Sequence, residues 1–173
     1  MNTKKVNESI RNIVESYKIK LANKSEEQFA LVPPIGGWSY SEVYSHIFDS
    51  SLLSLMAMNN CINGEGEAKS THFVVKVILF FGSFPPNKRY KVPTKLAVRV
   101  KKINLMAAQQ FITDFELQLL KTLPKIDNAN AKIKTKHPRL GYLNAKQWLR
   151  FIEIHLNHHL KQLNRIENSL TKS

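Results

Sequence analysis

The sequence contains a single cysteine, Cys61, among its 173 residues. One cysteine excludes an internal disulfide framework and cannot by itself build a thiolate metal site. Cys61 could in principle serve as a catalytic nucleophile, but nothing near it in the sequence marks an activated thiol. We therefore interpret it as a small, half-buried residue late in a helix.

Long apolar runs are also missing. The longest, Phe73–Phe81, is interrupted by Lys76 and falls well short of the roughly 20 residues that a membrane-spanning helix needs. We interpret this run as a buried element. The N-terminal segment lacks an apolar block followed by a small-residue cleavage site, so it resembles an amphipathic helix rather than a signal peptide. We expect a cytoplasmic protein that does not bind membranes.

Acidic residues are scarce: 13 Asp and Glu stand against 26 Lys and Arg, a formal net charge of +13. Such a charge would suit a nucleic-acid-binding protein, because clustered basic residues displace counterions from phosphates. Here the basic residues are spread over most of the chain, with modest concentrations at 88–102 and 131–139. Zinc-finger spacing and a basic region joined to a zipper are both lacking. We expect a solvated basic surface and no nucleic-acid partner, although the charge alone keeps that alternative open.

The remaining composition, 43% hydrophobic and 23% charged, is that of a folded protein, and the length suits a single domain over residues 1–173. Apolar residues recur at intervals of three and four in most of the chain, and proline and glycine separate the periodic segments. Thr71–Phe81 would serve a strand as well as a helix, but a lone strand has nothing to pair with. Polar, irregular connections are expected at 82–93 and 125–142. The predicted helices are Lys4–Asn23, a helix that starts at Ser39 and ends at Asn63, the short Thr71–Phe81, Leu96–Leu123 and Asn144–Leu170. Four long helices with long connections predict an all-α four-helix bundle with at least one crossover.

The helix that follows Ser39 has a complete start signal. Ser39 and Glu42 have the spacing of a capping box, in which each side chain bonds the other residue's backbone N–H. The apolar stripe after this cap has the spacing of one helix face and includes His46. His46 is therefore expected to face the interior of the bundle, one to two turns from the capped end.

His155 and His159 stand one helical turn apart on the inward stripe of the last helix, so both imidazoles can reach one metal ion. His46 brings a third imidazole from another helix. Three such ligands leave a coordination position open, which is typical of catalytic sites. The alternative is that these histidines are only hydrogen-bonding residues of the interior or surface. We expect His158 to be exposed and assign no role to His72 or His137, which lie in or beside loops.

Three segments carry a family resemblance that extends over nearly the whole chain. They are GGWSYSEVYSHIFDSS, PPNKRYKVPTKL and HPRLGYLNAKQWLRFIEIHLNHHLKQLNRIEN. Together they resemble the DinB/YfiT-like superfamily. The resemblance implies an up-down-down-up four-helix bundle with long crossover connections, often a homodimer, that binds a metal through three histidines. Carried over by position, the ligands are His46, His155 and His159, with Gln162 at the family's spacing.

The resemblance further implies a metal-dependent enzyme that acts on a small organic substrate. Characterised relatives use a low-molecular-weight thiol in transfer or isomerisation, whereas the YfiT-like branch is generally described as hydrolytic. We expect one divalent ion per chain, zinc or nickel first and iron or manganese as alternatives. Asp49 could orient His46 or accept a proton, or could be a surface residue, and Gln162 could form a hydrogen bond near the ion.

Two further interpretations remain open at the level of sequence. The chain could be a non-enzymatic basic module that binds nucleic acid or another acidic partner, with histidines that are structural or hold a structural ion. It could also keep the fold and the metal but act only as a dimeric scaffold.

Overall fold

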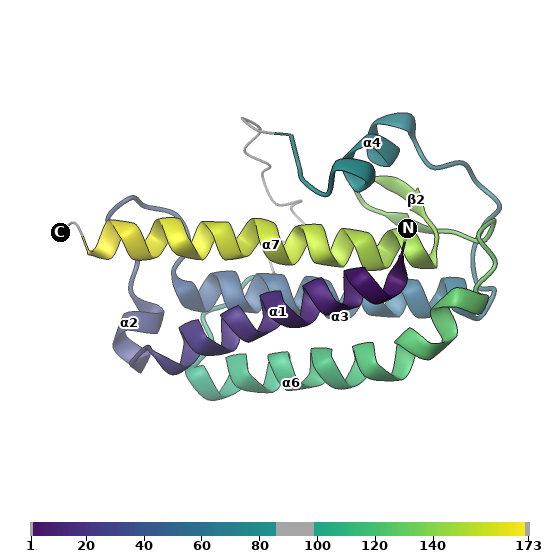
Figure 1. The fold of residues 1–173 in the computed structure, drawn as a ribbon. Coiled ribbons are helices and arrows are strands. Elements are labelled where there is room, and N and C mark those ends of the chain that lie inside the picture. Colours follow the sequence, from purple (N-terminus) through teal and green to yellow (C-terminus); the bar gives the residue numbers. More distant parts are fainter. Residues whose placement is uncertain (1, 86–98, 172–173) are drawn as a thin grey trace.

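Four long helices form the body of the protein, whose computed structural model describes residues 2–85 and 99–171 (Figure 1). They are α1 (Thr3–Ala22), α3 (Tyr40–Ile62), α6 (Leu105–Thr122) and α7 (Ala145–Leu170). In Figure 1, α1 and α7 run in one direction and α3 and α6 run in the other. Helices α1 and α3 each pack against both α6 and α7. The predicted up-down-down-up bundle is confirmed.

The connections carry small elements of their own. Because α3 and α6 are parallel, the chain between them must return along the length of the bundle. This connection includes the short helix α4 (Phe73–Phe81), and α2 (Glu26–Ala30) lies between α1 and α3. A 3-10 helix (Leu123–Asn128) and a hairpin of β1 (Thr135–His137) and β2 (Gly141–Leu143) join α6 to α7.

The helix starts follow the predicted capping signals. Ser39 accepts from the backbone N–H of Glu42, and the Glu42 carboxylate accepts from the N–H of Ser39, so the capping box is formed. Asn144 and Gln147 make the same reciprocal pair at the start of α7. These bonds satisfy backbone N–H groups that have no partner within the helix.

Two predicted boundaries need correction. A helix from Leu96 was predicted, but residues 99–104 are not helical and α6 begins at Leu105, where the Asn104 side chain accepts from the N–H of Ala107. Residues 86–98, including most of the predicted connection at 82–93, lie outside the described residues. The connection at 125–142 was expected to be irregular, yet it forms the 3-10 helix and the hairpin. Three-residue strands are too short to leave a periodic signal.

Helix α4 is confirmed, but its predicted burial is only partly right. Val75, Ile78 and Leu79 are buried, whereas Phe73 and Phe80 are 78% and 81% exposed. One face of the helix packs against α7. Among the described residues, no helix is both long and apolar enough to span a bilayer.

Hydrogen bonds from buried tyrosines link α1, α3 and α7. The Tyr17 hydroxyl donates to the carbonyl of Leu156 at 2.8 Å, and the Tyr44 hydroxyl donates to the carbonyl of Tyr17 at 2.7 Å. The Tyr40 hydroxyl donates to the carbonyl of Leu163. The rings of Tyr17 and Tyr44 meet edge to face at 5.4 Å. These directional bonds set the axial positions of α1 and α3 against α7.

Replacing Tyr17 by Phe should lower the free energy of unfolding by about 1 kcal/mol, because it removes a buried hydrogen bond between α1 and α7. Chemical denaturation followed by circular dichroism measures this. The matched control is Tyr142→Phe, which removes a hydroxyl that bonds Glu67 at the surface. Equal losses in the two variants would contradict the role given to the Tyr17 hydroxyl.

Candidate metal centre

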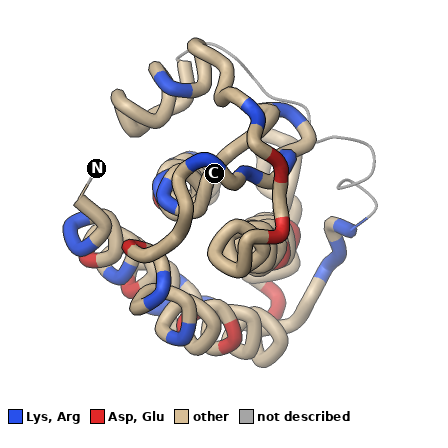
Figure 2. Tube along the Cα trace, turned by 90° about the vertical axis from the view of Figure 1, so that its right-hand side faces the viewer, with Lys and Arg blue, Asp and Glu red and all other residues tan. Residues whose placement is uncertain are grey.

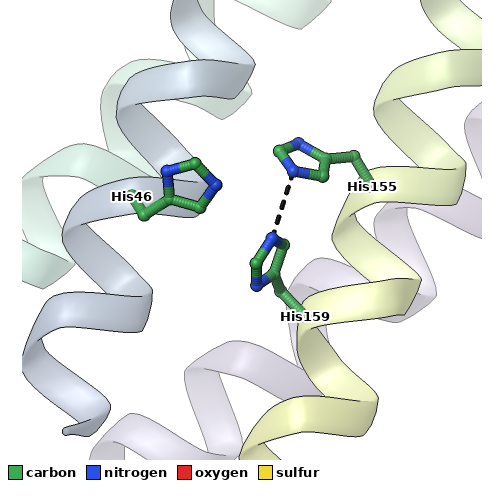
Figure 3. Close-up of side chains that lie close together, drawn as sticks. All are labelled: His46, His155 and His159. Carbon is green, nitrogen blue, oxygen red and sulfur yellow. Dashed lines mark hydrogen bonds between the residues drawn. The ribbon is translucent and has the colours of Figure 1, made fainter. Parts of the chain in front are cut away.

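Three imidazoles converge between α3 and α7 (Figure 3). His46 projects from α3, and His155 and His159 project from successive turns of α7. One nitrogen of each ring lies within 4.8 Å of the corresponding nitrogens of the other two. His46 and His159 are buried and His155 is half-buried. The structure thus brings together the three histidines that were predicted as metal ligands.

Neighbouring side chains determine which ring nitrogens carry protons. The Gln162 side-chain oxygen lies 2.8 Å from His159 Nδ1, and this oxygen can only accept, so Nδ1 is the protonated nitrogen. The Ser50 hydroxyl donates to the carbonyl of Ile47 and lies at a long 3.5 Å from His155 Nδ1. The Gln162 contact leaves the Nε2 atom of His159 free of a proton.

The two Nε2 atoms lie 3.1 Å apart, the contact drawn as a dashed line in Figure 3. In the metal-free protein this contact is a hydrogen bond, with the proton on His155 Nε2, and a divalent ion bound to both nitrogens would take the place of that proton. Metal–nitrogen bonds of about 2.0–2.1 Å are compatible with such a separation. The residues present therefore fit a divalent ion, and the contact from Gln162 is typical of the second nitrogen of a metal-bound imidazole.

Burial keeps the three imidazoles neutral. It lowers the pKa of His46 to about 4, with a smaller lowering from His158 and an opposing effect from the nearby carboxylate of Asp49. It also lowers the pKa values of His155 and His159 well below the usual range, and the neighbouring histidines add to this effect. At neutral pH all three rings are in the form that binds metals.

Asp49 does not extend the histidine cluster. Its two carboxylate oxygens accept from Arg99 at 2.7 and 2.6 Å, and no hydrogen bond to His46 is found among the described residues. The carboxylate lies along a separate surface depression. The predicted catalytic role of Asp49 therefore stays a prediction that no contact supports. Gln162 does contact His159, while any part it takes in catalysis also stays a prediction.

A pocket of about 370 Å³ opens directly onto the imidazoles. All three histidines line it, together with Ser50, Ser54 and His158. Among the described residues, no carboxylate lines this pocket. Most of the remaining wall is apolar or aromatic, and is formed by Leu53, Met56, Ala57, Phe84, Pro138, Leu140, Trp148 and Phe151.

The sequence interpretation missed two histidines of the pocket. His158 was predicted to be exposed, but it is half-buried against the ring of Phe84 at 5.4 Å and lines the pocket. His137 was given no role, yet its ring packs 4.6 Å from that of Phe151 and also lines the pocket. The sequence signal that could have indicated the position of His137 is the run His-Pro-Arg-Leu-Gly. Proline and glycine in this run indicate a turn, and a turn can direct an adjacent side chain toward the interior.

Trp38 and Cys61 are not among the residues that line this pocket. Trp38 lies beside the cluster, with its ring 5.0 Å from that of His46. Cys61 is buried, its Sγ lies 3.3 Å from the Thr135 hydroxyl, and burial raises the pKa of its thiol. Because it is outside the pocket lining and protonated, Cys61 has no features of an activated nucleophile.

Comparisons with known proteins agree with this architecture. A family model described as the DinB superfamily matches residues 19–163. The solved structure of TT2238, a four-helix bundle protein, is 14% identical, with a TM-score of 0.62 over 95% of this chain and 99% of that one. YfiT from Bacillus subtilis is 15% identical, with a TM-score of 0.58 over 98% of this chain and 87% of that one. YfiT is described as a probable metal-dependent hydrolase with an unusual four-helix bundle topology.

No curated protein matches the chain. The two solved structures share too little sequence to show more than the fold. The family match covers most of the chain and includes His46, His155 and His159. This chain therefore belongs to the DinB superfamily.

Proposed function

We propose that this protein is a metal-dependent enzyme that holds one divalent ion through His46, His155 and His159 and acts on a small organic substrate in the adjoining pocket. The observation that carries the proposal is the convergence of three neutral imidazoles, two of them with Nε2 atoms 3.1 Å apart, on the wall of a pocket. The likeness to YfiT, itself described as a probable metal-dependent hydrolase, supports it.

The set of three nitrogen donors indicates the kind of ion. Imidazole ligands suit zinc, nickel and iron, and we propose zinc or nickel first. Three protein ligands leave at least one coordination position for water or substrate. When bound, such an ion lowers the pKa of a coordinated water or thiol and can polarise a substrate oxygen.

The protein's own residues orient the ligands. Gln162 holds the proton of His159 on the nitrogen that faces away from the proposed ion, and Ser50 lies beside Nδ1 of His155. The largely apolar wall of the pocket offers few hydrogen-bond partners near the imidazoles. The described lining offers no carboxylate as a general base. The ion itself would therefore have to lower the pKa of the nucleophile, whether that nucleophile is a bound thiol or a bound water.

Two reactions remain for the same site. Transfer that depends on a low-molecular-weight thiol is favoured by the affinity of zinc and nickel for soft sulfur ligands. Hydrolysis is favoured by the description of YfiT. The alternative of a basic binding module rests on the net charge of +13 alone.

Purified protein should carry about one equivalent of zinc or nickel per chain, and His46→Ala, His155→Ala and His159→Ala should each lose most of it. Elemental analysis after gel filtration measures the stoichiometry. His158→Ala is the matched control, because it removes the adjacent histidine of α7 and should leave the metal bound. Metal-free wild-type protein that binds duplex DNA with steep salt dependence would instead support the binding module.

Gln162→Leu should weaken metal binding by about 10–100-fold, because His159 loses the acceptor that fixes its tautomer. Titration against a chelating dye gives the affinity. Gln109→Leu makes the same change at an exposed position of α6 and should have no effect. Unchanged affinity in Gln162→Leu would show that this contact does not support the ion.

Metal-loaded protein should join a low-molecular-weight thiol to an electrophile such as 1-chloro-2,4-dinitrobenzene, and chelation should abolish the reaction. Bacillithiol, mycothiol and glutathione are compared, beside a panel of esters and amides without thiol. Ester or amide cleavage in the absence of thiol would decide in favour of hydrolysis. A His155→Ala variant as active as wild type would reject both reactions at this site.

A further inference from the structure

The hairpin of β1 and β2 forms one wall of the pocket and carries Arg139 in its turn. Strand pairing joins Thr135 to Leu143 and His137 to Gly141. The His137 Nδ1 accepts from the backbone N–H groups of Arg139 and Leu140 at 3.1 and 3.0 Å. This imidazole therefore holds the backbone of the turn in place, and Arg139 is presented from a fixed position.

The hairpin is tied to the helices that carry the metal ligands. The Thr135 hydroxyl donates to the carbonyl of Ala57 on α3 at 3.0 Å and accepts from the indole N–H of Trp148 on α7 at 2.8 Å. The His137 ring packs on Trp148 and Phe151. The turn cannot shift far without breaking these contacts, so its position relative to the imidazoles is determined by the fold.

The pocket extends along both helices from the imidazoles to the hairpin. On α7 its lining passes from His159 and His155 to Phe151 and Trp148, toward the end of the helix where the hairpin lies in Figure 1. Trp148 lies seven positions before His155, which corresponds to a rise of about 10 Å in an α-helix. A ligand that reaches both ends therefore needs an elongated body, and the apolar side chains between them suit a hydrophobic one.

The charge at the hairpin end is positive. Arg139 and Lys136 are the charged residues of the described lining, and neither forms an ion pair with a described carboxylate. Two other arginines do form ion pairs: Arg99 pairs with Asp49, and Arg150 pairs with Glu153. Figure 2 shows the basic residues in blue and the acidic residues in red. Arg139 lies close enough to His137 to lower the pKa of that imidazole further, although burial is the larger cause.

We propose that Arg139, assisted by Lys136, binds an anionic group of the substrate, so that the substrate is a small organic acid whose apolar body extends toward the three imidazoles. A guanidinium at the mouth of an apolar pocket suits a carboxylate, which it can bind through two parallel hydrogen bonds. The assignment of this ligand as the substrate rests on the proposed function. The anion subsite itself depends only on the hairpin and the pocket.

The test compares two ligands with the same apolar body, 4-phenylbutyrate and 4-phenylbutan-1-ol, by calorimetry at low salt. Chelator-treated and zinc-loaded protein are both used. Metal-free wild type should bind the carboxylate about tenfold more tightly than the alcohol. Arg139→Gln should reduce this preference to about twofold, Lys136→Gln should reduce it less, and Arg139→Lys should retain part of it. Lys132→Gln, which removes an exposed charge outside the pocket, should leave the preference unchanged.

Three results would overturn the proposal: an unchanged preference in Arg139→Gln, a preference that exists only with zinc bound, or no binding of either ligand to wild type. The second would mean that the metal, not Arg139, takes the carboxylate. Circular dichroism checks that each variant folds. If the protein binds no metal but prefers the carboxylate through Arg139, the proposed function fails while the anion subsite stands. Metal binding without the preference would reject the anion subsite and leave the metal-dependent function standing.

Discussion

The antiparallel packing of α3 against α7 is the constraint on which the rest of the structure depends. It places His46 opposite His155 and His159, and it places Ala57 level with Trp148, where Thr135 links both helices to the hairpin. Buried tyrosine hydroxyls that bond carbonyls of α7 hold the axial register. A shift of one residue along α7 would rotate the two histidines by about 100° and separate them from His46.

The same packing creates an arrangement of imidazoles that suits a cation. Burial keeps the imidazoles neutral in a pocket with few polar partners. Gln162 and Ser50 contact the outer nitrogens of His159 and His155, and the inner Nε2 atoms contact one another at 3.1 Å. An ion bound between the three rings would give each of them a stronger partner. The arrangement is therefore one that a bound ion would complete.

Local signals predicted much of this fold, and the tertiary arrangement accounts for what they missed. The Ser39 capping box and the three-and-four spacing around His155 and His159 are properties of single helices, so they could be read directly. The helix order came from the family resemblance, which also supported the grouping of His46 with the other two that the inward stripes had suggested. The pairing of Asp49 with Arg99 joins residues 50 positions apart, and no local pattern encodes it. Likewise, the position of His137 follows from strands too short for any periodicity.

Anomalous diffraction from crystals of zinc-loaded protein tests the proposed metal centre most directly. We predict one strong peak per chain between α3 and α7, bonded at about 2.0–2.1 Å to one nitrogen of each of the three histidines. Nδ1 of His159 should remain hydrogen-bonded to Gln162. A peak elsewhere, or the lack of any peak at this cluster at saturating zinc, would contradict a metal centre built on these three imidazoles.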